Sequence, residues 1–230
     1  MQVFSDLPKD CNTVQWLAMG NAESSVFVPA FSGITDTHDA YKVDGTAYSP
    51  DSAWWKFKSV ATLAQSDRQH LMAGTQAFWK AQEKAELKQI KKAVKKVSTK
   101  YKSSKAAGRK YVTKLGKDMA EKQLNNSDVL YNALMYITTN NDNDRAYGEG
   151  DRRKDFAKPV DLVKAAKKAG FKVKVDGNLY NLKKGGKTYT LVLYSKEYRI
   201  DGAYEDDMAY AIFEAHGTVW APANFADYFG

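Results

Sequence analysis

The sequence predicts a mixed α/β (α+β) fold, and three patterns along its 230 residues support that class. Short apolar runs separated by glycine and proline fill residues 1–50, which is typical of strands joined by loops. Residues 51–140 carry apolar side chains at helical spacing over several long stretches. Residues 158–230 combine a short helix with alternating strands and a Gly-Gly turn, which predicts a small second α+β region.

Two strands are predicted in the first fifty residues. The first is the run from Thr13 to Met19, which Gly20-Asn21 ends, and the second is the run from Ser25 to Pro29, which its proline closes. A turn or short helix is expected over residues 35–41.

Several helices follow, and short links predict that they run antiparallel. The first opens at an N-cap formed by Asp51 or Ser52 and runs to about Gln65. Further helices are predicted over about 71–101, about 109–124 and from Val129 onward, with breaks at 102–108 and at the polar stretch 125–128. One apolar stripe is expected on the long second helix, formed by Leu87, Ile90, Val94, Val97 and Tyr101.

The polar, glycine-containing stretch 141–157 is predicted to be a linker. Beyond it we expect a helix over 159–169 closed by Gly170, a strand over 171–175 and a hairpin of 179–182 with 188–194. Further strands are predicted to end near Gly202 and Pro222, and a last helical piece begins at Phe225. Gly185-Gly186 is interpreted as the hairpin turn and not as a phosphate loop, because no Lys-Ser/Thr pair opens a helix after it.

The composition excludes several classes of protein. With 43% hydrophobic and 13% aromatic residues, the chain can bury a core and is not a disordered tail. A single cysteine excludes a disulfide scaffold and a cysteine-rich zinc module. We expect no membrane span, since no run approaches the roughly 18–20 apolar residues required. We also expect no signal peptide in this sequence, because the first residues lack a basic start and an apolar core.

The net charge of +8 is concentrated in one segment. Residues 80–122 hold fifteen basic and four acidic side chains, a local +11, whereas the remainder of the chain is at −3. Such a segment could bind nucleic acid or another anionic surface, or it could be the solvated face of packed helices. Within residues 80–122 lysine dominates, Arg109 is the only arginine, and no aromatic side chain stands among the lysines before Tyr101. These features favour a solvated face and make nucleic-acid binding the weaker interpretation.

No residue type or spacing identifies a catalytic or metal site. Cys11 would need a neighbouring base, or processing after Asp10, to act as a nucleophile, and a loop or partly buried thiol is the simpler interpretation. The three histidines have no metal-ligand spacing; they are His38, His70 and His216. We therefore predict no catalytic residue, no metal and no cofactor, and leave the substrate-binding residues unassigned.

Other polar and aromatic residues allow two interpretations. Asp142 and Asp144 could begin a calcium loop, but the glycine and terminal glutamate of an EF-hand are not at the required offsets. Asn21 and Asp36 follow apolar runs and could line a site, although turn chemistry explains both equally well. The tryptophans of the first region are expected in the core rather than on a substrate platform; they are Trp16, Trp54, Trp55 and Trp79.

Several short motifs in order resemble the C-terminal half of the secreted cysteine dipeptidases, the dipeptidase A family of N-terminal-nucleophile (Ntn) hydrolases. They lie between about Asp6 and Asn140 and comprise Asp6-Leu7-Pro8, Val14-Gln15-Trp16-Leu17-Ala18, Ser25-Val26-Phe27-Val28-Pro29, Ile34-Thr35-Asp36-Thr37, Ala40-Tyr41, Ser52-Ala53-Trp54-Trp55 and Phe78-Trp79. The resemblance implies that residues 1–140 form part of an Ntn-hydrolase-like sheet over 1–50 and a helical region over 51–140. It also implies hydrolysis of small peptides by an N-terminal cysteine whose own α-amine acts as the base.

A second resemblance covers residues 158–230, which are similar to the copper-amine-oxidase N-terminal-like stalk domain of bacterial surface proteins. Its motifs are Pro159 with Leu162, Ala169-Gly170-Phe171, the Gly185-Gly186 hairpin, Ile200-Asp201-Gly202 and Gly217-Thr218-Val219-Trp220-Ala221-Pro222. This resemblance implies a structural or adhesive role and no copper site.

Together the resemblances imply an extracellular or cell-surface protein that acts on small peptides. The family's nucleophile lies upstream of everything matched, so we expect the chain to be the C-terminal portion of such an enzyme and inactive alone. The alternative is a non-enzymatic module that binds the cell surface or anionic cell-wall polymers.

Overall fold

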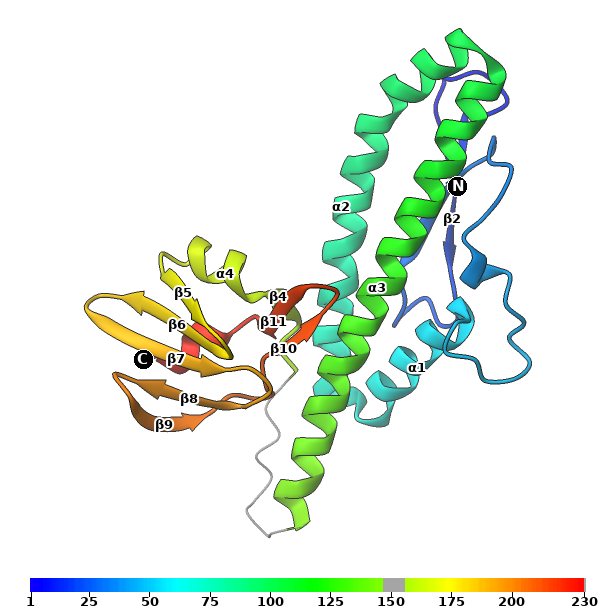
Figure 1. The fold of residues 1–230 in the computed structure, drawn as a ribbon. Coiled ribbons are helices and arrows are strands. Elements are labelled where there is room, and N and C mark those ends of the chain that lie inside the picture. Colours follow the sequence, from blue (N-terminus) through cyan, green and yellow to red (C-terminus); the bar gives the residue numbers. More distant parts are fainter. Residues whose placement is uncertain (147–155, 230) are drawn as a thin grey trace. The chain divides into compact units, whose positions relative to one another are not determined.

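The computed structural model describes residues 1–146 and 156–229, with side chains for 1–139 and 156–229. Long helices and antiparallel sheets confirm the mixed α+β class (Figure 1). The chain packs as two compact units, one of residues 1–62 and 76–127 and the other of residues 63–75 and 128–230. The predicted division into 1–140, a linker at 141–157 and 158–230 stays a prediction, and residues 147–155 of that linker lie outside the described part.

The first unit begins with an antiparallel sheet of order β1-β2-β3, formed by β1 (Gln2–Val3), β2 (Thr13–Ala18) and β3 (Phe27–Phe31). Val14 pairs with Phe31 and Leu17 pairs with Val28 across the two longer strands. Val14 and Phe31 belong to an apolar core that the sheet shares with the helices of this unit; Leu7, Cys11, Ile90, Ala93, Val97, Val112, Leu115 and Met119 complete it. A 3₁₀ turn, η1 (Asp39–Tyr41), occupies the segment that the sequence marks as a turn or short helix.

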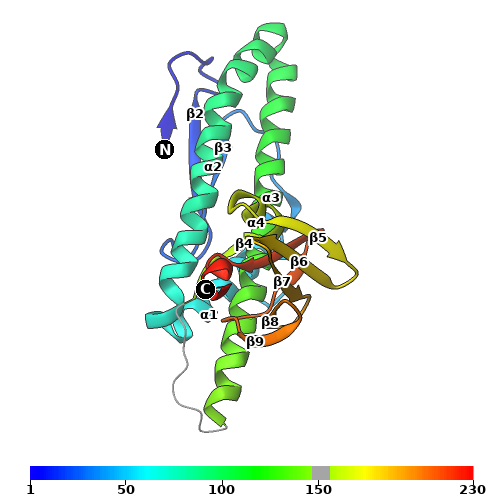
Figure 2. The same ribbon diagram turned by 90° about the vertical axis from the view of Figure 1, so that its left-hand side faces the viewer.

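Three helices follow, α1 (Ala53–Ser66), α2 (Arg68–Ser103) and α3 (Lys105–Ala146). Within the first unit α2 and α3 lie side by side and antiparallel (Figures 1 and 2). The break predicted over 102–108 is a single residue, Ser104, whose Oγ accepts a hydrogen bond from the Ala107 backbone N–H at 3.0 Å. Ser104 is therefore the N-cap of α3. Only glycine fits at position 108, because Tyr101 packs directly over it and a Cβ there would overlap the ring.

The break predicted at 125–128 is wrong, because α3 continues through it. The polar side chains that suggested a cap instead make hydrogen bonds within α3 and to α2. Asn126 Nδ2 donates to Gln82 Oε1 at 3.1 Å and to Gln123 Oε1 at 2.9 Å, and Ser127 Oγ donates to the Leu124 carbonyl at 2.6 Å.

The apolar stripe predicted for α2 is displaced by one residue at its start. Ile90 and Val97 are buried as expected, but Leu87 is 42% exposed and Glu86 is fully buried in its place. Glu86 lies four residues before Ile90, in phase with the buried Ala93 and Val97, so the buried face of α2 includes a carboxyl group.

The second unit contains the C-terminal strands and a short helix. Strand β4 (Pro159–Asp161) leads into α4 (Leu162–Lys168), where Asp161 caps the helix by accepting a hydrogen bond from the Lys164 backbone N–H. A meander of order β5-β6-β7-β8-β9 follows, and a second sheet has the order β10-β11-β4. The strands are β5 (Lys172–Asp176), β6 (Leu179–Lys184), β7 (Lys187–Val192), β8 (Glu197–Ile200), β9 (Ala203–Asp207), β10 (Phe213–Ala215) and β11 (Thr218–Pro222).

The predicted hairpin turn is present, with Gly185 and Gly186 at φ of 58° and 83° between β6 and β7. The last helical piece is a 3₁₀ helix, η2 (Phe225–Phe229), whose phenylalanines pack with Phe171 and Tyr189. The sequence did not predict β1, β4, β9 or β10, and β4 occupies the start of the helix predicted over 159–169. Strands β1, β4 and β10 have at most three residues, and β9 is an exposed acidic edge strand. In the described part of the chain, every helix is too short or too polar to cross a bilayer.

Candidate functional site

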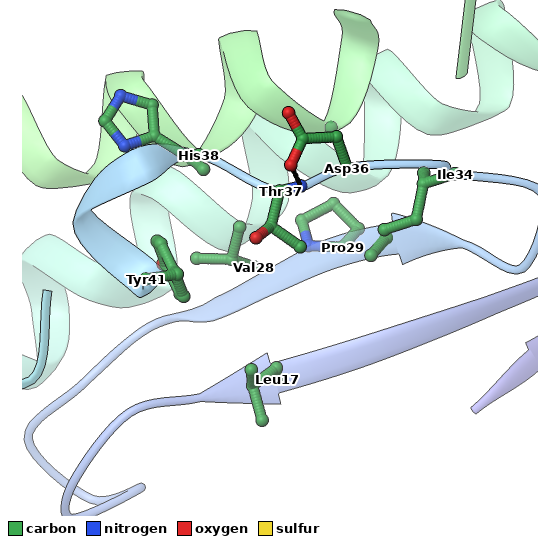
Figure 3. Close-up of a pocket in the computed structure, with 11 residues that line it drawn as sticks. Leu17, Val28, Pro29, Ile34, Asp36, Thr37, His38 and Tyr41 are labelled. Carbon is green, nitrogen blue, oxygen red and sulfur yellow. Dashed lines mark hydrogen bonds between the residues drawn. The ribbon is translucent and has the colours of Figure 1, made fainter. Parts of the chain in front are cut away.

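The first unit contains a small apolar pocket at the end of the β2–β3 ribbon (Figure 3). Its cavity volume is about 70 Å³. The walls come from both strands, from the segment that follows β3, and from one face of α3. The lining residues are Leu17, Val28, Pro29, Ala30, Ile34, Asp36, Thr37, His38, Tyr41, Gly116 and Ala120.

The segment 34–41 is fixed over the pocket by contacts at both of its ends. The Ile34 backbone N–H donates to the Phe31 carbonyl at 3.2 Å, which turns the chain back after β3. The Thr35 backbone N–H then donates to Thr113 Oγ1 on α3 at 3.0 Å. In Figure 3 the Thr37 side chain points toward β3, whereas the Asp36 carboxylate points the opposite way. The segment therefore both lines the pocket and binds α3.

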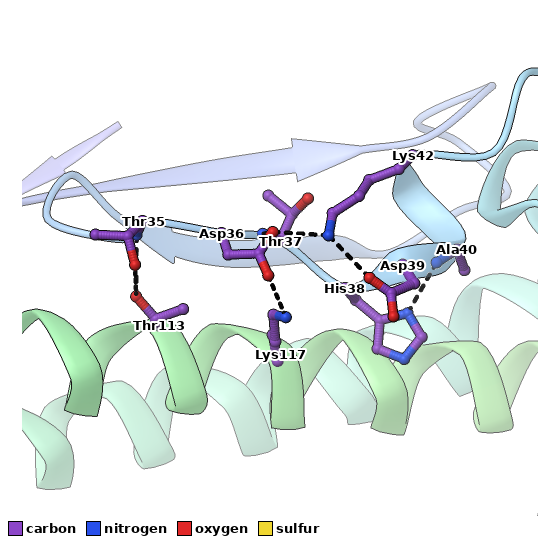
Figure 4. A network of polar contacts seen from close by, with 9 residues as sticks. All are labelled: Thr35, Asp36, Thr37, His38, Asp39, Ala40, Lys42, Thr113 and Lys117. Carbon is purple, nitrogen blue, oxygen red and sulfur yellow. Dashed lines mark hydrogen bonds and ion pairs between the residues drawn. The ribbon is translucent and has the colours of Figure 1, made fainter.

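Asp36 is the centre of a network of ion pairs (Figure 4). Its carboxylate contacts Lys42 Nζ at 2.7 Å, pairs with Lys117 of α3, and accepts a hydrogen bond from the Thr37 backbone N–H at 2.9 Å. Hydrogen bonds from Lys117 and Lys42 hold the pKa of Asp36 well below its usual range. A carboxylate stabilised in this way is a weak base, so Asp36 anchors the segment to α3 rather than accepting a proton in catalysis.

His38 lines the pocket with both ring nitrogens engaged. Nδ1 accepts a hydrogen bond from the Ala40 backbone N–H at 3.2 Å, which leaves the proton on Nε2 in the neutral ring. Nε2 donates to Glu121 Oε2 on α3 at 2.5 Å. The imidazole is therefore held in one orientation and one tautomer as part of the pocket wall.

A buried polar cluster lies near Tyr41, whose ring also lines the pocket. Glu86 of α2 is completely buried, and among the described residues neither of its oxygens makes a hydrogen bond of normal geometry. Burial raises the pKa of Glu86 to about 8, while the neighbouring Gln123 amide and Lys122 lower it in part. Burial also raises the pKa of the Tyr41 hydroxyl, to which the Glu86 charge adds. Glu86 is therefore largely protonated at neutral pH.

Cys11 lies in the core of the first unit rather than at the pocket. The thiol is fully buried, and burial raises its pKa, while the nearby Tyr101 hydroxyl opposes the rise. A buried thiol with a raised pKa holds little thiolate, which is the nucleophilic form. Its environment fits the structural interpretation of this residue.

The other two histidines lie in the second unit, each with its own aspartate. His70 Nδ1 lies 2.9 Å from Asp67 Oδ1, and His216 Nε2 lies 3.2 Å from Asp128 Oδ2. Among the residues that the structure describes, no three His, Cys, Asp or Glu side chains gather as metal ligands. Asp142 and Asp144, the possible calcium loop, have helical backbone at the end of α3, and their side chains lie outside the described residues.

The remaining candidates have structural contacts. Asn21 Oδ1 accepts a hydrogen bond from the Glu23 backbone N–H at 3.0 Å, which is turn chemistry. Trp79 is buried, as expected, and its Nε1 donates to the Ser24 carbonyl at 2.9 Å. Trp16 is half-buried against the core, and Trp55 is half-buried with its Nε1 donating to the Ala47 carbonyl. Trp54 differs from the expectation of a core residue, since it is 39% exposed.

Sequence reasoning missed the residues that α2 and α3 contribute. Lys117 and Glu121 hold the 34–41 segment, and Gly116 and Ala120 line the pocket between them. Their spacing of four is a helical signal that they share one face, but nothing in the sequence says that this face meets residues 34–41. The burial of Glu86 could have been predicted, because it lies four residues before Ile90 and so on the same helix face.

Comparison with known proteins confirms the resemblance to the dipeptidase A family. Residues 1–81 match the model of peptidase family C69. The probable dipeptidase B of Streptococcus pyogenes serotype M1 is 25% identical over 121 residues, which cover 53% of this chain and 24% of that protein. The match thus spans about a quarter of that relative's length. No solved structure matches the chain. The resemblance of residues 158–230 to a stalk domain stays a prediction.

Proposed function

We propose that this chain takes part in the hydrolysis of small peptides as a portion of a dipeptidase-like enzyme. The observation that carries this proposal is the composition of the pocket. Nine of its eleven lining residues lie within residues 1–81, the range that matches peptidase family C69. Those residues include positions 28, 29, 34, 36, 37 and 41 of the motifs. We propose that the pocket and its rim form one wall of the peptide site.

The proposed reaction needs a thiolate that Cys11 is poorly suited to supply. In the superfamily that the sequence resembles, an N-terminal cysteine attacks the peptide carbonyl and releases the amine, and water then hydrolyses the thioester. Cys11 is fully buried, is not N-terminal in this sequence, and has a raised pKa. We therefore propose that the nucleophile comes from outside these 230 residues and that this chain alone does not turn over dipeptides.

Dipeptide hydrolysis by the purified chain, measured with and without thiol alkylation, tests this part of the proposal. We expect no turnover above background in either case. The matched control is Cys11→Ser, which removes the only thiol. Turnover that is lost both on alkylation and in Cys11→Ser would show that Cys11 is the nucleophile and would refute the proposal of inactivity.

A second candidate function is attachment to an anionic polymer of the cell surface, through a lysine ladder on α2. The ladder consists of exposed lysines at intervals of four residues: Lys80, Lys84, Lys88, Lys92 and Lys96. Among the described residues, no ion pair engages any of the five. Successive lysines are about 6 Å apart along the helix axis, in a row that winds gradually around α2, and each like-charge pair at this spacing destabilises a helix by about 0.2–0.5 kcal/mol. A linear polyanion would remove that repulsion. A stalk domain at 158–230 would fit the same cell-surface role.

Retention on purified cell wall, measured against salt concentration, tests the second candidate. Changing the five ladder lysines to glutamine should abolish salt-dependent retention. The matched control changes five lysines of the C-terminal region, for example Lys164, Lys167, Lys168, Lys172 and Lys174, and should leave retention in place. Equal loss in both variants would show a dependence on net charge only and would remove the case for the ladder.

A further inference from the structure

The pocket has the dimensions of a site for one small aliphatic group. Its volume of about 70 Å³ exceeds the roughly 10–15 Å³ that one water requires, and it is smaller than the roughly 150 Å³ cavity that holds benzene. The lining is almost entirely apolar, with Val28 and Ile34 among the wall residues. Leu17 is 45% exposed, so the pocket reaches the surface. A cavity with these walls favours a hydrocarbon side chain over water.

The space exists because α3 carries small residues where it faces the pocket. Gly116 and Ala120 lie one turn apart and both line the cavity. A Cβ added at Gly116 would have Ile34 Cγ2 as its nearest neighbour, at 3.9 Å, which is an ordinary van der Waals contact. Packing therefore does not require glycine at this position, in contrast to Gly108. Glycine in a helix interior is less stable than alanine by roughly 0.5–1 kcal/mol, so the sequence keeps a less stable residue that leaves the pocket open.

The surroundings of the pocket suit the polar main chain of a peptide. Lys42 pairs with Asp36, one of the lining residues, and its side chain is 47% exposed. The Lys117 ammonium joins the same network from α3. The apolar cavity would select the side chain of a bound peptide.

We propose that this pocket binds the aliphatic side chain of a short peptide, of valine, proline or leucine size, and so sets a preference for aliphatic over glycine dipeptides. This inference rests on the proposed function, in which the chain forms one wall of the peptide site. Gly116 and Ala120 determine the specificity, because their small size fixes the depth of the cavity.

Binding of Gly-Leu and Gly-Gly to the full chain, followed by methyl NMR, tests the proposal. We expect Gly-Leu to shift the methyl signals of Leu17, Val28 and Ile34, and to bind about tenfold more tightly than Gly-Gly. Ala120→Leu should fill the cavity and reduce Gly-Leu binding to the level of Gly-Gly. Gly116→Val is the second variant, in case Ala120→Leu does not fold. Ala85→Leu is the matched control, since Ala85 is exposed on α2, and it should bind as the unsubstituted chain does.

The outcomes separate this inference from the proposed function. If both peptides bind equally and both filled variants retain Gly-Leu binding, the side-chain pocket is refuted while the peptide-site wall stands. If Gly-Leu shifts signals elsewhere in the chain but not at the three pocket residues, both the side-chain pocket and its place in the wall of the peptide site are refuted. If neither peptide binds the unsubstituted chain, both proposals fail. Loss of Gly-Leu binding in a folded filled variant, with Ala85→Leu unaffected, supports the pocket.

Discussion

Glu86 makes the first unit sensitive to alkaline pH, and the change Glu86→Gln should remove that sensitivity. The carboxyl is completely buried between α2 and its neighbours, and burial raises its pKa to about 8. Ionising it in place requires a carboxylate without strong partners in an apolar interior, which is unfavourable. The groups that face it are Tyr41, Glu83, Lys122 and Gln123. Of these, only Lys122 and Gln123 favour the charged form.

The sign and size follow from the two pKa values of Glu86. The folded chain holds this proton up to a pH of about 8, whereas the unfolded chain loses it near the ordinary glutamate pKa of 4.5. The folded state therefore binds more protons in this interval, and the free energy of unfolding decreases as pH rises from about 4.5 to about 8. At about 1.4 kcal/mol per pH unit, the loss is about 3–5 kcal/mol. That is a large fraction of the 5–15 kcal/mol typical of a folded domain.

Urea unfolding between pH 5 and pH 9 measures this effect. Glu86→Gln keeps the shape of the side chain without its charge, so its stability should decline less steeply and should exceed that of the unsubstituted chain above pH 8. Asp118→Asn is the control, since Asp118 is exposed on α3 and is not among the groups that face Glu86, and it should keep the original slope. Parallel pH profiles for the unsubstituted chain and Glu86→Gln would refute the reasoning, because Glu86 would then have the same pKa in both states.

Three further predictions concern the helices and the Asp36 network. Gly108→Ala should destabilise the chain by about 1–3 kcal/mol in urea unfolding, because its Cβ would overlap the Tyr101 ring. Gly116→Ala should instead stabilise the chain by up to about 1 kcal/mol, because its Cβ meets only an ordinary contact. Equal effects of the two substitutions would contradict the difference in free space around the two glycines. Ser104→Ala removes the N-cap of α3 and should lower stability by about 1 kcal/mol, while Ser104→Asp should retain it; no loss in the alanine variant would mean that the cap is unimportant. Asp36→Asn should reduce the loss of stability below pH 4. The pKa of Asp36 is lower in the folded chain than in the unfolded chain, so its ion pairs stabilise the fold above the unfolded-state pKa, and this stabilisation is lost as pH falls. An unchanged acid transition in urea titrations would show that the network does not stabilise the fold.

The sequence predicted elements well where one local signal decides the structure. Gly185-Gly186 could only be a hairpin turn, and both glycines have the positive φ that such a turn requires. The runs at 13–19 and 25–29 became β2 and β3 within two residues at each end. The errors occurred where tertiary contacts replace a local signal. Asn126 and Ser127 look like a cap in sequence, yet they lie inside α3 because Gln82, Gln123 and Leu124 satisfy their side chains.

The pocket could not be predicted either, and the physical reason is different. The cavity is open because Gly116 and Ala120 have little or no side chain. These positions meet residues 34–41 only after α3 has packed on the β2–β3 ribbon. For Asp36 the sequence allows either a site residue or a turn residue. Its partner Lys117 is 81 residues away, and a lysine in a lysine-rich helix carries no distinguishing signal.

A buried polar layer between α2 and α3 adjoins the pocket at Tyr41, so the packing of these two helices affects the proposed site. Tyr41 presents its ring to the pocket, while its buried hydroxyl lies in the electrostatic field of Glu86. Buried polar groups can fix one packing register at a cost in stability, because every alternative register would bury them with worse partners. Gln82, Gln123 and Asn126 form the hydrogen-bonded part of this layer between α2 and α3. If the layer fixes the register, Glu86→Leu should keep or raise stability at pH 8 and yet weaken Gly-Leu binding, because α3 could then shift relative to Tyr41. Unchanged Gly-Leu binding in a more stable Glu86→Leu variant would show that apolar packing alone positions the pocket.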